Sequence, residues 1–108
     1  SMFSECTRLR TPPELPATTL ASNCYDNMFY NCTNLIACPE LPATTLESYC
    51  YRYMFYRCTK LKVNTSSGTK IFTCPSTIPS GAVNDMFYYT GGSFKGTPTA
   101  GNTYYYTL

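Results

Sequence analysis

The chain has 108 residues, of which only 13% are charged, and its net charge at neutral pH is +2. So weak a charge gives no electrostatic reason to expect nucleic acid or an anionic membrane surface as a partner. No apolar run approaches the roughly 20 residues that a membrane span needs, so we expect no membrane insertion in this segment.

The N-terminal half of the chain is a tandem repeat. The eight letters PELPATTL occur at residues 13–20 and again at residues 39–46. The blocks around them, residues 2–27 and 28–53, agree at 16 of 26 positions, and a third copy opens with MFYRCTKLKV at Met54 before it diverges. A fixed period in the twenties predicts stacked repeats, in which each unit buries a face against the next one.

Within one repeat, the sequence predicts a short strand, a corner and a helical arc. Residues 34–38 alternate in character and lack glycine, which predicts a strand with Leu35 and Ala37 facing inward. Pro39 has no N–H to donate and so ends the strand. Residues 47–58 lack proline and glycine, and apolar or cysteine side chains recur there every four residues. This spacing predicts one face of a helix or of consecutive short helical turns.

The order MFxxCTxL, PELPATTL and CYxxMF resembles the BspA-like leucine-rich repeats of bacterial surface proteins, over residues 2–63. The resemblance implies a curved solenoid with a parallel sheet on its concave side, in secreted or surface-anchored proteins that act in adhesion. We therefore predict an α/β leucine-rich-repeat solenoid, with short parallel strands, irregular or short helical convex segments and a β-rich C-terminal cap.

The C-terminal third departs from the repeat. Residues 61–64 and 69–75 predict two strands about a glycine-containing turn, and residues 103–108 predict an edge strand. We expect residues 1–63 to hold about two and a half repeats of 26 residues. Residues 64–108 would form a divergent terminal repeat and β-hairpin cap, within one structural domain.

The N-terminal end of the array shows no cap. The CY pairs that precede MF at Cys24 and Cys50 have no counterpart before Met2. We therefore expect a piece of a longer protein, or self-association through the uncapped end.

The seven cysteines fall into two groups. Five follow the 26-residue period, in the registers Cys6, Cys32, Cys58 and Cys24, Cys50. The closest pair is six residues apart and histidine is absent, so we expect buried free thiols at these five positions and no metal.

Cys38 and Cys74 lie outside both registers, and on the predicted alternation they point away from the core. They could form a disulfide if their Cα atoms lie within about 7 Å. Alternatively, one of them is a free thiol open to intermolecular pairing.

Nothing in the sequence predicts catalysis. Histidine is absent, which removes the usual general base, and no glycine-rich phosphate loop is present. Among six carboxylates a glycosidase-like pair is conceivable, but Glu14 and Glu40 are repeat equivalents whose proximity has a structural reason. We predict a chain that is not an enzyme, with no catalytic, cofactor-binding or metal-binding residues and no cofactor.

A basic surface is the better candidate for function. The outward positions of the predicted strand carry Arg8, Asn34 and Lys60 in one register, and Arg10 and Lys62 in the next. They predict a basic concave patch for a partner with acidic groups. The alternative is a solvated sheet face whose lysines prevent aggregation.

Tyrosines are the second candidate. Tyr49 and Tyr53 are additions on the helical arc of the second repeat, and we predict that they are surface contacts for a ligand. Tyrosines that recur with the repeat, such as Tyr30 and Tyr56, are more simply explained by packing.

These observations predict a non-catalytic module of a bacterial cell-surface or secreted protein, which binds a host or bacterial surface protein or a glycan in adhesion. One alternative is a structural spacer that projects another domain. Another is an accessory module of a carbohydrate-active enzyme.

Overall fold

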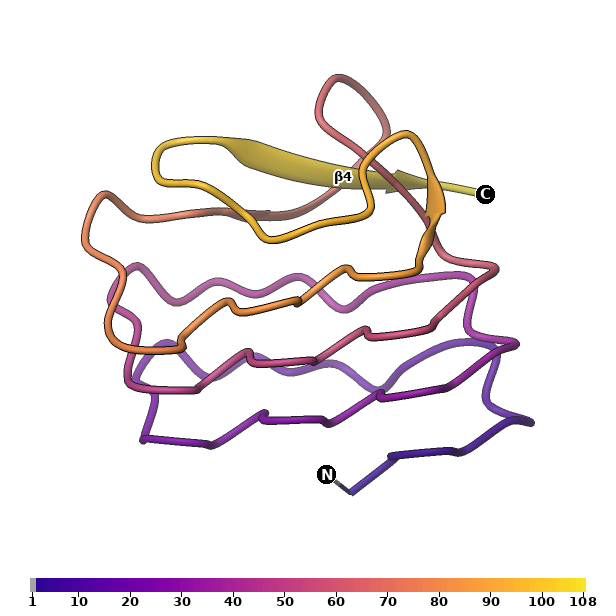
Figure 1. The fold of residues 1–108 in the computed structure, drawn as a ribbon, viewed down its shortest axis with the longest axis horizontal. Coiled ribbons are helices and arrows are strands. Elements are labelled where there is room, and N and C mark those ends of the chain that lie inside the picture. The colour runs from indigo at the N-terminus through magenta and orange to yellow at the C-terminus, as the bar shows by residue number, and fades with distance from the viewer. Residues whose placement is uncertain (1) are drawn as a thin grey trace.

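Successive repeats lie over one another as layers in the computed structural model, which describes residues 2–108 (Figure 1). Backbone hydrogen bonds join the layers at equivalent positions. The N–H of Phe3 donates to the carbonyl of Met28 at 3.1 Å, and the N–H of Phe29 donates to that of Met54 at 2.9 Å. The N–H of Phe55 donates in the same way to Met86 at 2.9 Å, although 32 residues rather than 26 separate Met54 from Met86.

The arc of each layer is a run of tight turns. It covers residues 22–31, 48–57 and 80–89, and every fourth residue has a positive φ. These left-handed positions are Asn23, Asn27 and Asn31 in the first run, Tyr49, Tyr53 and Arg57 in the second, and Gly81, Asp85 and Tyr89 in the third. Because the chain reverses its local curvature at each of them, it advances as a zigzag and does not wind into a helix.

This zigzag places side chains inward and outward in pairs. In the second run Cys50 and Tyr51 are buried, Arg52 and Tyr53 lie toward solvent, and Met54 is buried again. N–H groups alternate as well. In the first run, the N–H of Met28 closes a local turn on Tyr25 at 3.1 Å, while its neighbour Phe29 bonds to the next layer.

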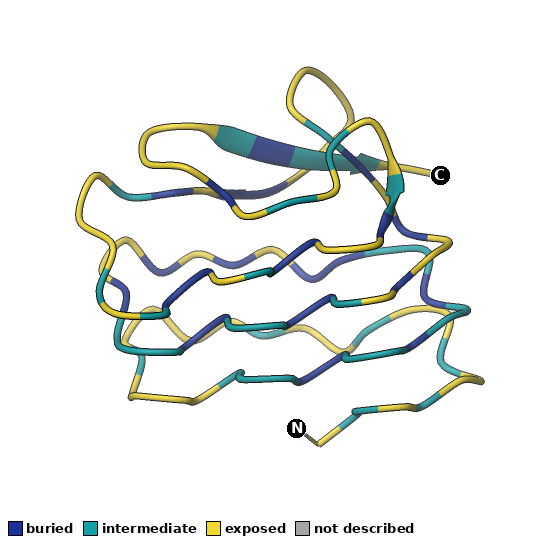
Figure 2. Cartoon of the chain, viewed as in Figure 1, coloured by how far each residue is buried: buried dark blue, intermediate teal, exposed yellow. Residues whose placement is uncertain are grey.

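The core consists of columns of like side chains. Phe3, Phe29, Phe55 and Phe87 stack with ring centroids 5.5 to 5.6 Å apart and nearly parallel planes. Phe55 and Phe87 are fully buried, whereas Phe3 is only partly buried, and Figure 2 shows the same increase of burial from the first layer to the later ones. Each layer therefore depends on neighbours on both sides for its burial.

The regular strands belong to the C-terminal half. They are β1 (Lys62–Asn64), β2 (Thr69–Thr73), β3 (Gly91–Gly92) and β4 (Thr103–Thr107). They form one sheet in the order β2-β4-β1-β3, in which β1 is parallel to β3 and antiparallel to β4, and β4 is antiparallel to β2.

The prediction of an α/β leucine-rich-repeat solenoid is wrong. Residues 2–108 contain no helix, and their four strands make a small mixed sheet in place of a row of parallel strands. The expected strand at residues 34–38 is irregular, and the expected helical arc at residues 47–58 is a run of turns. The physical reason for the missing helix is the left-handed residue at every fourth position of the arc, which interrupts an α-helix.

The C-terminal strands also pair differently from the sequence prediction. β1 and β2 are not a hairpin, because β4 lies between them and bonds to both. The closing strand is therefore central and not an edge. The connection after β1 is a turn in which the Asn64 side chain accepts bonds from the N–H groups of Ser66 and Ser67, both at 2.9 Å. Gly68 follows, and a Cβ there would overlap the carbonyl oxygen of Tyr106 in β4.

We expect a β-branched residue at a left-handed position to destabilise the fold. Asn27 has φ 59°, which Asn and Gly tolerate and Val does not. Asn27→Val should lower the free energy of unfolding by about 1–2 kcal/mol relative to Asn27→Gly, as measured by urea denaturation. Asn84, an exposed asparagine of the third run without positive φ, supplies the matched control Asn84→Val. Equal losses at both positions would contradict this explanation of the turns.

Candidate binding site

The four basic residues of the predicted patch are at the surface, and one of them, Lys60, is linked to Asn34 of the preceding repeat. Arg8, Arg10, Lys60 and Lys62 are exposed, and Asn34 is half-buried. The Lys60 ammonium donates to the Asn34 side-chain oxygen at 2.9 Å, and the Asn34 amide donates to the carbonyl of Thr7 at 2.6 Å. Asn34 and Lys60 therefore help to join three layers, and Lys60 also places a positive charge at the surface.

Lys60 and Lys62 border a cavity of about 600 Å³ beside β3, which we call the β3 cavity. Its other lining residues are Ile36, Thr59, Gly91, Gly92, Thr107 and Leu108. Arg8 and Arg10 line neither this cavity nor the one described next. The structure therefore brings together only part of the predicted patch.

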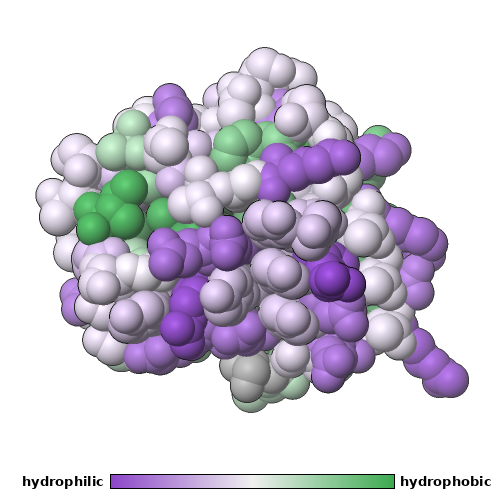
Figure 3. Space-filling view, viewed as in Figure 1, coloured by the Kyte–Doolittle hydropathy of each residue, from purple (hydrophilic) through white to green (hydrophobic). Residues whose placement is uncertain are grey.

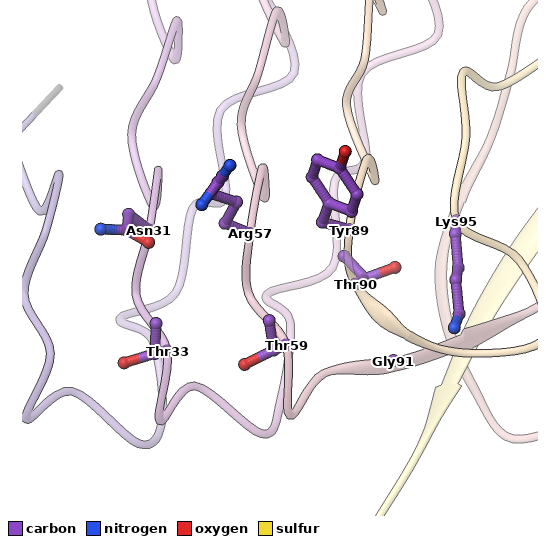
Figure 4. A pocket seen from close by; sticks show the side chains of 8 residues that line it. All are labelled: Asn31, Thr33, Arg57, Thr59, Tyr89, Thr90, Gly91 and Lys95. Carbon is purple, nitrogen blue, oxygen red and sulfur yellow. The ribbon is translucent and has the colours of Figure 1, made fainter.

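A second cavity, of about 490 Å³, opens along the outward ends of three layers, and we call it the Arg57 cleft (Figure 4). Its lining residues are Asn31, Thr33, Arg57, Thr59, Tyr89, Thr90, Gly91 and Lys95. It shares Thr59 and Gly91 with the β3 cavity, so the two adjoin. Neither lining contains an aspartate or glutamate, so the combined surface favours an anion.

Repeat-equivalent residues form the wall of the Arg57 cleft. Asn31, Arg57 and Tyr89 lie in one row on successive layers, with Thr33 and Thr59 in a second row (Figure 4). The first three have φ between 60° and 61°, so each is the left-handed residue that ends an outward pair. The turn pattern thus fixes where these side chains leave the backbone.

Gly91 lines both cavities and lies where they adjoin. It follows Thr33 and Thr59 in the repeat, but a Cβ at this position would lie 2.8 Å from the carbonyl oxygen of Thr59. Its N–H donates to the carbonyl of Leu61 at 2.8 Å. A glycine is therefore required for this close approach of β3 to the preceding layer.

Arg57 is positioned by aromatic rings. Its guanidinium carbon lies 5.2 Å from the ring centroid of Tyr89 and 5.9 Å from that of Tyr56, within the range of cation–π attraction. Tyr56 also stacks between Tyr30 and Tyr88, with centroid distances of 5.0 and 5.5 Å. The outward face of the turns therefore carries an ordered tyrosine ladder beside the cleft, and its recurring members do pack on one another.

Tyr49 and Tyr53, the predicted contact residues, are half-buried and lie outside both cavities. The Tyr49 ring covers Gly81, where a Cβ would overlap it. Arg52 lies over both tyrosine rings, at 4.6 and 5.5 Å from their centroids. Much of their surface is thus used within the molecule.

Sequence reasoning missed the ion pair that Arg52 makes with Asp26. The guanidinium donates to both carboxylate oxygens, at 3.1 and 2.7 Å. Burial alone would raise the pKa of Asp26, but hydrogen bonds from Arg52 and Asn23, together with the positive charge of Arg52, lower it overall. The spacing of 26 residues was the available signal, since it places the two side chains in one register on adjacent layers.

All seven cysteines are free thiols in this structure. Cys24 is exposed and Cys6 is half-buried, whereas the others, Cys32, Cys38, Cys50, Cys58 and Cys74, are buried. The thiols of Cys32 and Cys58 each donate to a backbone carbonyl at 3.0 Å, and burial raises the pKa of Cys50 to about 11.

Cys38 and Cys74 differ from the prediction that they point away from the core. Both are buried and unbonded to each other. The alternation used for Cys38 fails because residues 34–38 do not form a strand.

The residues described give no support for a catalytic carboxylate pair, a metal site or a membrane-spanning helix. Glu14 and Glu40 are exposed and border a shallow cavity of about 340 Å³ at consecutive corners, as their repeat equivalence predicts. In residues 2–108, no cluster of three or more potential ligand side chains could hold a metal ion. The same residues include no helix long and apolar enough to cross a membrane.

The face of the molecule shown in Figure 3 is mostly neutral to hydrophilic, with a few apolar areas. Comparisons of the chain with protein-family models, with curated proteins and with solved structures find no match.

The cysteines give a direct test of the layer packing. Under native, mildly alkaline conditions iodoacetamide should modify Cys24 fastest and Cys6 more slowly, while the five buried thiols react only after urea is added. Peptide mass spectrometry identifies the modified positions. If Cys38 and Cys74 stay unmodified in urea until a reductant is present, the two form a disulfide and their free state is contradicted.

The Arg52–Asp26 pair should make stability depend on pH in the acid range. Because the pKa of Asp26 is lowered by folding, the stabilisation is complete above the unfolded value of about 3.9 and is lost as pH falls through the lower folded value. The urea midpoint of the wild type should therefore approach that of Asp26→Asn as the pH is lowered. A midpoint difference that stays constant across this range would contradict the assignment.

Proposed function

We propose that this chain is a non-catalytic binding module of a bacterial cell-surface or secreted protein, which attaches to a surface protein or glycan through acidic groups on that partner. The observation that carries the proposal is the pair of adjoining cavities. They contain Arg57, Lys60, Lys62 and Lys95 but no aspartate or glutamate.

Charge balance strengthens this proposal. The four cations belong to a chain with only eight Lys and Arg residues and six Asp and Glu residues. Among residues 2–108, the one ion pair is Arg52–Asp26, which lies outside the cavities. Cations without a carboxylate partner bind an incoming anion without first breaking an ion pair.

The resemblance of the MFxxCTxL and PELPATTL motifs to BspA-like repeats supports a surface location and a role in adhesion. This support comes from the motifs alone, because the fold that the resemblance implies differs from the one observed. The lack of histidine supports a binding role over a catalytic one.

The proposal predicts a loss of binding when the charge of the β3 cavity is reversed. The double variant Lys60→Glu, Lys62→Glu should lower the affinity for a matrix-protein or glycan partner by about tenfold or more, since charged hydrogen bonds are lost and like charges are introduced. Panels of immobilised matrix proteins and glycans provide the measurement.

Lys70 in β2 is exposed and outside both cavities, so Lys70→Glu is the matched control and should bind as the wild type does. Circular dichroism checks that each variant is folded. If the folded wild type binds nothing on either panel, the binding function is refuted in favour of a spacer. Hydrolysis of any panel glycan would refute the non-catalytic assignment.

A further inference from the structure

We infer that the Arg57 cleft binds an anionic sugar residue, a pyranose ring that carries a carboxylate or a sulfate. The inference rests on the proposed binding function and specifies both the class of partner and its place. Four properties of the cleft support it: its charge, its aromatic wall, its hydroxyl lining and its size.

The charge comes from two cations on different segments. Arg57 lies on the second run of turns and Lys95 follows β3, and the structure records no ion pair for either of them within residues 2–108. The aromatic rings near Arg57 restrict its guanidinium group. A planar guanidinium presents paired N–H donors that match a carboxylate or a sulfate, and a restricted one loses less entropy on binding.

The aromatic wall is the ring of Tyr89, which is 49% exposed. It makes edge contacts with Tyr88 and Tyr56 at centroid distances of 4.2 and 6.0 Å, so its orientation is set before a ligand arrives. An ordered, half-exposed phenol ring presents a flat apolar face and a hydroxyl group. The C–H face of a pyranose packs on such a ring while the sugar hydroxyls bond around it.

The lining favours a sugar over an acidic peptide. Thr33 and Thr59 supply hydroxyls and Asn31 supplies an amide, which act as donors and acceptors for sugar hydroxyls (Figure 4). None of the eight lining residues is aliphatic, so the cleft lacks the apolar pocket in which peptide side chains commonly anchor. Its volume of about 490 Å³ is within the range of ligand pockets, about 300–1,000 Å³, and so has room for more than a small anion.

The first experiment compares defined probes by calorimetry at low salt. Hyaluronan and heparin tetrasaccharides supply carboxylated and sulfated sugars, chitotetraose supplies a neutral one, and tetraglutamate supplies charge without sugar. The wild type should bind at least one anionic tetrasaccharide about tenfold more tightly than chitotetraose and tetraglutamate. Equal binding of tetraglutamate would overturn the choice of a sugar, as would a failure to bind either anionic tetrasaccharide.

The second experiment locates the site. Arg57→Asn and Tyr89→Asn introduce the residue that the chain itself has at the equivalent left-handed position, Asn31, so the backbone should be retained. Each should lower the affinity for the anionic tetrasaccharide about tenfold, whereas Lys70→Gln should leave it unchanged. Thermal unfolding checks that each variant is folded. Unchanged affinity in folded Arg57→Asn, or an equal loss in Lys70→Gln, would refute this site.

The outcomes separate this inference from the function on which it rests. Suppose that no anionic tetrasaccharide binds but a matrix protein does, and that the double variant Lys60→Glu, Lys62→Glu abolishes that binding. The sugar inference is then refuted, and the binding function is supported. If the folded wild type binds none of the probes and nothing on either panel, the sugar inference and the binding function are both refuted.

Discussion

The structure depends on one arrangement of backbone hydrogen bonds. Along each arc, N–H groups alternate between closing a local turn and bonding to the next layer, as Met28 and Phe29 do. This alternation needs a left-handed residue at every fourth position, and nine of those described are not glycine. Asn and Asp tolerate this conformation, but at the other five positions, Glu5, Tyr49, Tyr53, Arg57 and Tyr89, it costs roughly 1–2 kcal/mol each. This cost is offset only because the layer bonds and the buried ring columns form together, which makes each layer conditional on its neighbours.

The same arrangement separates core from surface. Since side chains point inward and outward in pairs, adjacent residues such as Met54 and Phe55 are both buried and the next pair is outside. Inward pairs must match the pairs above and below them, which keeps Phe over Phe and explains why MF recurs in every layer. Outward pairs are less constrained. Tyr30, Tyr56 and Tyr88 still stack, but the residue that follows each of them changes from layer to layer without altering the path of the chain.

The sequence predicts the repeat period, but it does not predict the conformation of the arc or the position of β4. The 26-residue period is visible in the letters, and it recurs in the structure as the spacing of the stacked rings. The helical prediction for the arc fails because Cys50, Met54 and Cys58 recur every four residues, a spacing that a helix and this run of turns both accommodate. Two features distinguish the turns: apolar residues come as adjacent pairs, and the first run has Asn at all three left-handed positions. In the second run tyrosine and arginine replace asparagine, so the residue that best tolerates left-handed backbone is missing there. The place of β4 between β1 and β2 was beyond local reasoning, since it results from pairing with segments some 30 to 45 residues earlier in the chain.

The candidate site lies where the regular repeat changes. At the equivalents of Gly91 the earlier layers have Thr33 and Thr59, and glycine is needed here because the backbone of β3 approaches the preceding layer closely. Gly91 lines both the Arg57 cleft and the β3 cavity, so the two cavities adjoin at this close approach. The left-handed register beside it carries Glu5, Asn31, Arg57 and Tyr89 in successive layers, at nearly the same φ. The backbone keeps its direction at these positions while the side chain changes from acid to amide, cation and phenol, so recognition can vary on a constant fold. Three of these variable positions, Asn31, Arg57 and Tyr89, line the cleft. The irregular end of the array is therefore the part in which a binding site arises with the least disturbance to the stack.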